Sequence, residues 1–266
     1  MSISNIDHIV IAVDNLEQTI VDYQELGFTV FPGGEHPGGR SHNALVIFAD
    51  GSYFELIAFK QERPGWRWWD VLQSHGQGLV DYALLPTEVE RDYDALRERG
   101  LEIDGPIDGG RTRLDGQQVV WKNARAKTSD LPFLCGDITP RVLRVPEGEV
   151  REHANGVVGV AGITVVVRDL AASVGRYRLL LNAEPLSVTR VAGLGIDTAV
   201  FKLGDARVTL VAPNETKGLV GASLEQHLVA RGEGPYAVAL RTNNPERVGV
   251  LDQKLAHGAI LELLVD

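Results

Sequence analysis

Residues 6–13, Ile-Asp-His-Ile-Val-Ile-Ala-Val, form a run rich in β-branched side chains and predict a strand. Alternation along this strand places His8 on one face, beside small neighbours, and Asp7, Ile9 and Ile11 on the other face. The second face is suited to packing beneath a helix. The first face leaves room beside the imidazole of His8. A half-buried strand whose histidine is simply hydrogen-bonded is the alternative interpretation.

A second strand, residues 53–59, supplies a candidate partner for His8. Its sequence is Tyr-Phe-Glu-Leu-Ile-Ala-Phe, so Glu55 stands in an apolar run. A carboxylate is costly to bury unless it is paired with a cation or bound to a metal ion. We therefore expect His8 and Glu55 to face the same side of one sheet.

Composition limits the classes of function. The 266 residues have a formal net charge of −10, which argues against nucleic acid or an anionic membrane as partner. No run is long enough to span a bilayer, and the amino terminus lacks a basic, apolar, cleavable signal. The single cysteine, Cys135, excludes an internal disulfide. These features predict a soluble, cytoplasmic protein.

The order strand, helix, strand, strand, strand recurs along the chain. In the first copy, we expect Asp14 to cap a helix over 16–26, and Gly27 to end it. The copies cover residues 3–59, 78–136, 157–212 and, in part, 235–264. In the partial copy, we expect a helix at 245–256, then one strand, and no counterpart of the last two strands.

These repeats predict an α+β fold built from βαβββ units. We expect two pseudo-symmetric domains, residues 1–140 and 157–266, of which the second is truncated. The truncation predicts an unpaired edge at the final apolar residues, 261–265, and exposed edges invite association. We therefore expect a two-fold homodimer that covers this edge, or alternatively a loop of the same chain over it.

Four motifs resemble those of glyoxalase-like domain proteins in the vicinal oxygen chelate superfamily, which includes glyoxalase I, extradiol dioxygenases and fosfomycin resistance proteins. They are Ile-Asp-His-Ile-Val at 6–10, Gly-Gly-Glu-His-Pro-Gly at 33–38, Ser-His-Asn-Ala-Leu at 41–45 and Gly-Ser-Tyr-Phe-Glu-Leu-Ile at 51–57. The resemblance implies that two βαβββ units pair into a curved mixed sheet around a cavity. It also implies metal ligands on the first and last strands of the units.

The resemblance places candidate ligands at His8 and Glu55, and a divalent Fe, Mn, Ni or Zn ion suits such nitrogen and oxygen donors. Glu55 would also transfer a proton. His42 would be an acid/base group, a third ligand, or only a histidine at the end of a strand. In the second unit, Asp81 aligns with His8 and is either a ligand or a solvated aspartate. Cys135 is either a soft-metal ligand or, preferably, a small buried side chain.

Further residues suggest a substrate pocket. Asn43 and Tyr53 belong to the resembling motifs. Trp66 and Arg67 lie in a Trp-rich segment that forms either a lid with a cation for an anionic group or a short helix at the sheet edge. His36 either covers the substrate or, preferably, is solvated in a loop.

The resulting hypothesis is metal-dependent lyase or isomerase chemistry on a small oxygen-rich or carbonyl substrate. The alternatives are a metal-free protein that sequesters a small molecule such as an antibiotic, and an extradiol-type dioxygenase. In the latter half of the chain, the sequence predicts no metal site.

Overall fold

The computed structural model describes residues 3, 5–216 and 218–265. The first half contains two successive βαβββ units joined by a short helix. Its strands and helices are β1 (Asn5–Val13), α1 (Leu16–Glu25), β2 (Phe31–Glu35), β3 (Ser41–Ile47), β4 (Tyr53–Phe59), α2 (Arg67–His75), β5 (Gly78–Leu85), α3 (Val89–Glu98), β6 (Ile103–Thr112), β7 (Gln118–Ala126), β8 (Phe133–Asp137) and α4 (Arg141–Arg144).

The strands of the first half close into a barrel, in the order β1-β4-β3-β2-β6-β7-β8-β5. β1 runs parallel to β4 and antiparallel to β5, so the first strand of each unit lies beside that of the other. In this register, His8 lies opposite Tyr53, and Val10 lies opposite Glu55. Side chains two residues apart share a face, so His8 and Glu55 both point into the barrel.

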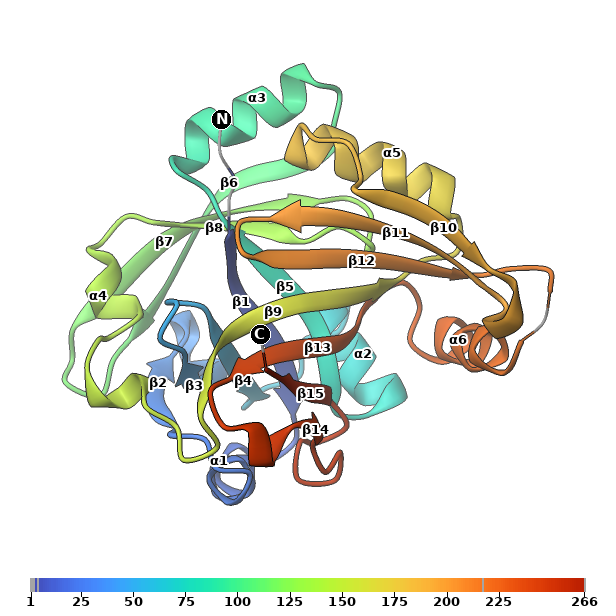
Figure 1. Ribbon diagram of the computed structural model, residues 1–266. Helices are drawn as coiled ribbons and strands as arrows, with labels where there is room; N and C mark the ends of the chain where they lie inside the picture. The colour runs from blue at the N-terminus through green and yellow to red at the C-terminus, as the bar shows by residue number, and fades with distance from the viewer. Residues whose placement is uncertain (1–2, 4, 217, 266) are drawn as a thin grey trace.

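The second half forms an open sheet in the order β10-β11-β12-β9-β13-β15-β14. Its strands and helices are β9 (Val157–Val166), α5 (Leu170–Leu181), β10 (Ser187–Val191), β11 (Ile196–Leu203), β12 (Ala206–Pro213), α6 (Leu219–Ala230), β13 (Gly234–Thr242), β14 (Gly249–Val250) and β15 (Ile260–Leu264). In Figure 1, β9 and β13 of this sheet lie in front of β1 and β5, and β13 contacts β5. Within the described residues, no helix has the length and apolar character needed to cross a bilayer.

The fourth unit departs from the prediction in its helix. Residues 245–256 form no α-helix; a 3-10 turn at Pro245–Arg247 and the short strand β14 take its place. Gly249 has a φ of 131°, outside the helical region, and glycine weakens a helix here because it adopts such angles without steric cost. The helix α6, which precedes β13 as α2 precedes β5, was not predicted.

The edge prediction for residues 261–265 is wrong. β15 runs parallel to β13, just as β4 runs parallel to β1, so it is the last strand of its unit. The truncated unit therefore lacks its helix and second strand, not its last two strands. β15 lies between β13 and β14, and Leu261 and Leu263 are fully buried. Deleting this segment would remove core, not a surface edge.

Two details of the first unit also differ. The pairing of β1 with β5 shifts register between Ile6 and His8, a β-bulge that turns the Asp7 carboxylate toward His8 instead of the helix face. Asn15, not Asp14, caps α1, because the Asn15 side chain accepts a hydrogen bond from the Gln18 backbone N–H.

Candidate metal and substrate site

His8 is held on three sides inside the barrel. Its Nδ1 lies 2.7 Å from Oδ2 of Asp7, and its ring stacks on Tyr53 with centroids 4.7 Å apart. The edge of Phe133 closes a third side. The remaining ring nitrogen, Nε2, lies 3.6 Å from Oε2 of Glu55. Asp7 thus fixes the ring orientation and leaves Nε2 facing the carboxylate.

Asp7 is fully buried and ionised. Arg144 donates from Nη1 to Oδ2 at 2.7 Å and from Nη2 to Oδ1 at 3.2 Å, and Arg141 donates to Oδ1 at 2.7 Å. Burial alone would raise the pKa of Asp7, but Arg144, His8 and Arg141 together hold it well below its usual range. Arg144 is itself buried and bonds Asp137 and the Tyr53 hydroxyl. This network anchors the orientation of His8.

Glu55 lies between two imidazoles. Its Oε1 accepts a hydrogen bond of 2.7 Å from Asn43 Nδ2 and lies 3.5 Å from Nε2 of His36. Burial raises the pKa of this carboxyl, but His36, His8 and Asn43 outweigh burial and lower it to about 2. Glu55 is therefore ionised at neutral pH, with one oxygen toward each histidine.

His36 is brought to the site by a hairpin, although the sequence favoured a solvated histidine. It follows directly after β2, and its backbone N–H donates to the carbonyl of Ser41 at the start of β3. Its Nδ1 lies 3.0 Å from the Ser41 hydroxyl, and Trp121 meets the ring edge-on. These contacts leave Nε2 free to face Glu55.

The donor atoms of His8, His36 and Glu55 are candidate ligands for a divalent ion. Two ligand atoms that each lie about 2.1 Å from a tetrahedral ion are about 3.4 Å apart. The two nitrogen–oxygen distances, 3.6 and 3.5 Å, are near this spacing and are too long for good hydrogen bonds, but His8 faces Oε2 of Glu55 and His36 faces Oε1. An ion shared by all three residues would therefore need the side chains to draw closer together. Two imidazole nitrogens and one carboxylate are suitable donors for Fe, Mn, Ni or Zn.

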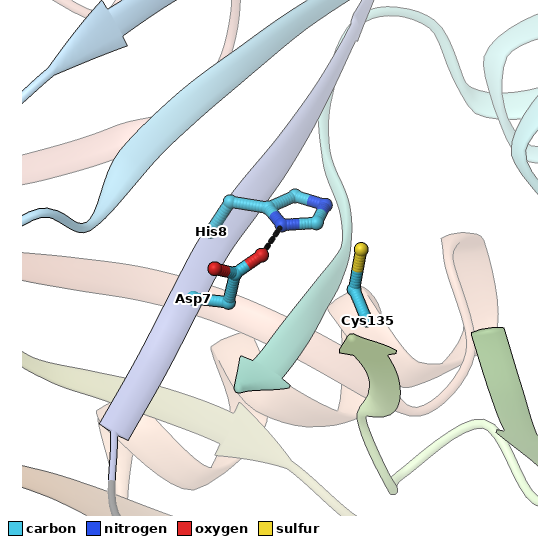
Figure 2. Close-up of side chains that lie close together, drawn as sticks. All are labelled: Asp7, His8 and Cys135. Carbon is cyan, nitrogen blue, oxygen red and sulfur yellow. Dashed lines mark hydrogen bonds and ion pairs between the residues drawn. The ribbon is translucent and has the colours of Figure 1, made fainter. Parts of the chain in front are cut away.

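A second set of potential ligands shares His8. One ligand atom from each of Asp7, His8 and Cys135 lies within 4.8 Å of the others. Figure 2 shows the three side chains close together. This set fits a metal less well, since both oxygens of Asp7 already accept from arginines and from the His8 ring. Burial raises the pKa of the Cys135 thiol to about 12, which opposes the thiolate a metal needs.

A cavity of about 360 Å³ opens beside His8, His36 and Glu55. The predicted pocket residues Tyr53 and Trp66 line it. Asn43 lies behind Glu55 and positions it. Trp68, Trp121 and Phe133 add further aromatic walls. This volume suits a small molecule.

Three predicted site residues lie elsewhere. His42 projects from the opposite face of β3 from Ser41 and Asn43, where burial and Lys60 lower its pKa. Asp81 accepts a hydrogen bond from the Trp68 indole in a separate cavity and does not join His8.

The third, Arg67, borders that second cavity and not the first. Its Nη2 donates to the carbonyls of Ser129 and Glu233, so it links α2 to the second half of the chain.

The barrel of paired βαβββ units, with acid and histidine donors facing its interior, defines the class of the protein. A family model for the glyoxalase-like domain matches residues 6–181, and the chain belongs to that family. A search of curated proteins gave no match.

Solved structures share the fold. A hypothetical protein from Staphylococcus aureus is 15% identical with a TM-score of 0.74, over 98% of this chain and 99% of that one. A mutant of 4-hydroxymandelate synthase from Streptomyces coelicolor is 17% identical with a TM-score of 0.65, over 94% of this chain and 77% of that one. A xylose isomerase-like TIM barrel/4-hydroxyphenylpyruvate dioxygenase fusion protein is 14% identical with a TM-score of 0.59, over 93% of this chain and 39% of that one.

Proposed function

We propose that the protein is a metal-dependent enzyme of glyoxalase-like type, acting on a small carbonyl or oxygen-rich substrate in the barrel cavity. His8, His36 and Glu55 would hold the divalent ion. The observation that carries the proposal is the convergence of two imidazole nitrogens on one buried, ionised carboxylate, at 3.6 and 3.5 Å. Membership of the glyoxalase-like family supports it.

A divalent ion bound there would act as a Lewis acid on neighbouring substrate oxygens and stabilise negative charge that develops on them. The side chains around it have separate tasks. Asp7 keeps the His8 Nε2 lone pair directed at the site, and Asn43 fixes the rotamer of Glu55. Glu55 is ionised and borders the cavity, so it would be the base that accepts a proton from carbon next to a substrate carbonyl, although its pKa of about 2 makes it a weak base until the site is occupied.

The aromatic side chains of the cavity exclude water from the reacting groups. Trp66, Trp68, Trp121 and Phe133 line it beside the donor atoms. Apolar walls strengthen electrostatic interactions within the site and limit hydrolysis of reactive species.

The test is hydrogen–deuterium exchange of probe substrates, hydroxyacetone and pyruvate, followed by proton NMR in D₂O. We expect metal-loaded protein to exchange protons next to the carbonyl, and Glu55→Gln to slow this by roughly 100-fold or more. Glu35→Gln is the matched control, because Glu35 is exposed and pairs with Lys60. If the probes bind but their protons do not exchange, the enzyme proposal is contradicted and a protein that only sequesters its ligand is favoured.

A second candidate is an iron-dependent oxygenase. Two histidines and one carboxylate with open positions are the donor set of non-haem iron(II) oxygenases. One of the proteins with a similar fold is named as a fusion that includes 4-hydroxyphenylpyruvate dioxygenase. Oxygen uptake by iron(II)-loaded protein with catechol as probe tests this candidate, and uptake equal to that of Glu55→Gln would exclude it.

A further inference from the structure

The cavity is basic, although the chain as a whole is acidic. Its net charge is −10. Among the described residues that line the cavity, arginines outnumber acids by five to two. The arginines are Arg40, Arg63, Arg111, Arg125 and Arg144, and the acids are Glu55 and Asp108. A cavity lined mainly by one sign of charge attracts ligands of the other sign.

Arg144 and Arg125 already have carboxylate partners. Arg144 binds Asp7 and Asp137, and Arg125 lies 3.3 Å from Asp81. Their charges are thus largely compensated by the protein itself.

Arg111 differs from them. It lies on β6, is only 2% exposed, and forms no ion pair within the described part of the chain. Its Nη2 donates to the carbonyl oxygen of Arg144 at 2.8 Å, while its Nε, also buried, has no partner among the described atoms. A guanidinium has five N–H donors, so much of its bonding capacity is unused. Burial lowers the pKa of Arg111, although Tyr53 and Glu55 act in the opposite direction, so the charge is costly to hold here without a bound anion.

Near Arg111, the backbone of β6 leaves space for the flat ring of Trp121, which forms a wall of the cavity. A Cβ at Gly109 would lie 2.3 Å from the Trp121 indole nitrogen, so only glycine allows Trp121 to lie against β6 here. Trp121, Arg111 and Glu55 all line the same cavity.

We propose that Arg111 anchors a carboxylate of the substrate, so that the substrate is a small carboxylic acid whose apolar part lies against the tryptophans. A carboxylate accepts two parallel hydrogen bonds from a guanidinium and offsets its buried charge. The substrate class rests on the proposed function for its chemistry, but the anion site itself stands without a metal ion.

Calorimetric titration of chelator-treated protein with benzoate and benzamide tests the site directly. These two probes have similar shape and differ in charge. We expect wild-type protein to bind benzoate at least about tenfold more tightly than benzamide, because a charge-assisted pair is gained. Arg111→Gln removes this preference, and Arg111→Lys retains part of it.

Arg113→Gln is the matched control. Arg113 follows on the same segment and also donates to a backbone carbonyl, that of Leu143, but it has Asp115 as partner and does not line the cavity. It should keep the benzoate preference. Equal binding of benzoate and benzamide by wild-type protein would overturn the proposal even if Arg111→Gln failed to fold, and so would tighter binding of inorganic phosphate than of benzoate.

The same preparations separate the two proposals. Metal uptake by Arg111→Gln should equal that of wild-type protein. If wild-type protein takes up metal but does not prefer benzoate to benzamide, only the anion site is contradicted. Absence of metal uptake with the benzoate preference intact contradicts the proposed function alone.

Discussion

At the scale of single residues, the neighbours of His8 determine what its ring can do. One nitrogen faces the ionised Asp7 and the other faces the ionised Glu55. Asp7 owes its ionisation to Arg144 and Arg141. The chemistry of the site thus depends on residues as far along the chain as α4.

Asp7→Asn should weaken metal binding by roughly 10–100-fold, as removal of a carboxylate that orients a ligand histidine does. Competition titration with a metal indicator measures this affinity. Asp137→Asn is the control, because Asp137 binds the same Arg144 but not His8. Equal loss of affinity in both variants would contradict the orienting role of Asp7.

The sequence located part of this site. A carboxylate in an apolar strand identified Glu55, and strand alternation paired it correctly with His8. Asp7 is also an acid within an apolar strand. The alternation of side chains does not predict the β-bulge that turns its carboxylate toward His8. The position of His36 depends on the geometry of the β2–β3 hairpin, and the position of Arg111 depends on closure of the barrel. Neither position can be predicted from the local sequence pattern.

At the scale of elements, β1 and α1 form the scaffold of the site. Ile9 and Ile11 pack into the core while Val10 and Ala12 face the barrel interior. The repeat predicted the helices and most of the strands of the first three units, but not β10. It failed in the fourth, where the backbone at Gly249 is not helical and the second strand is missing.

Ile11→Ala should lower the free energy of unfolding by about 2–5 kcal/mol, because a fully buried side chain leaves a cavity. Asn15→Ala should cost about 1 kcal/mol through loss of the α1 cap. Asp14→Ala, at an exposed position without a capping bond from its side chain, is the control. Urea melts that rank Asn15→Ala as more damaging than Ile11→Ala would contradict these assignments.

The helix α6 should make stability depend on pH. Burial, with a smaller effect of Arg231, lowers the pKa of His227 to about 4. The unfolded chain, with a histidine pKa of about 6.5, therefore binds this proton first, and stability falls as the pH decreases from about 6.5 to 4. The loss is on the order of 1–2 kcal/mol, since His227 is partly exposed.

His227→Gln should flatten this slope in urea melts between pH 7 and pH 4.5. His75→Gln, which replaces an exposed histidine, should leave it unchanged. An identical slope in wild-type protein and His227→Gln would show that other groups cause the pH dependence.

At the scale of the whole molecule, the two halves share one core. The cluster that contains Ile9 and Ile11 of β1 also contains Ile163 and Val165 of β9. Arg176 of α5 forms an ion pair of 2.7 Å with Asp130, and Arg241 of β13 pairs with Asp50 at 3.0 Å. The division into residues 1–140 and 157–266 stays a prediction, and these contacts favour joint unfolding.

Unfolding in urea should therefore be a single cooperative transition. All four tryptophans, Trp66, Trp68, Trp69 and Trp121, lie in the first half, so fluorescence follows that half while far-UV circular dichroism follows the whole chain. We expect the two midpoints to coincide. A fluorescence midpoint clearly separate from the dichroism midpoint would show that the halves unfold independently.

A homodimer also stays a prediction, with a changed basis. The edges of the second sheet are β10 and β14, not the terminal residues. Val188 on β10 is 61% exposed, and unprotected edges favour pairing between copies. The proposed metal site takes His8, His36 and Glu55 from one chain.

Cobalt(II) titration, followed by absorption spectroscopy, tests the central claim most directly. It compares wild-type protein with His36→Ala and Cys135→Ser, because the two candidate ligand sets share His8 and differ in these residues. We predict that His36→Ala loses binding by at least about tenfold. Cys135→Ser should bind like wild-type protein, with no sulfur-to-cobalt charge-transfer band in either. Loss of binding in Cys135→Ser, with normal binding in His36→Ala, would contradict the account.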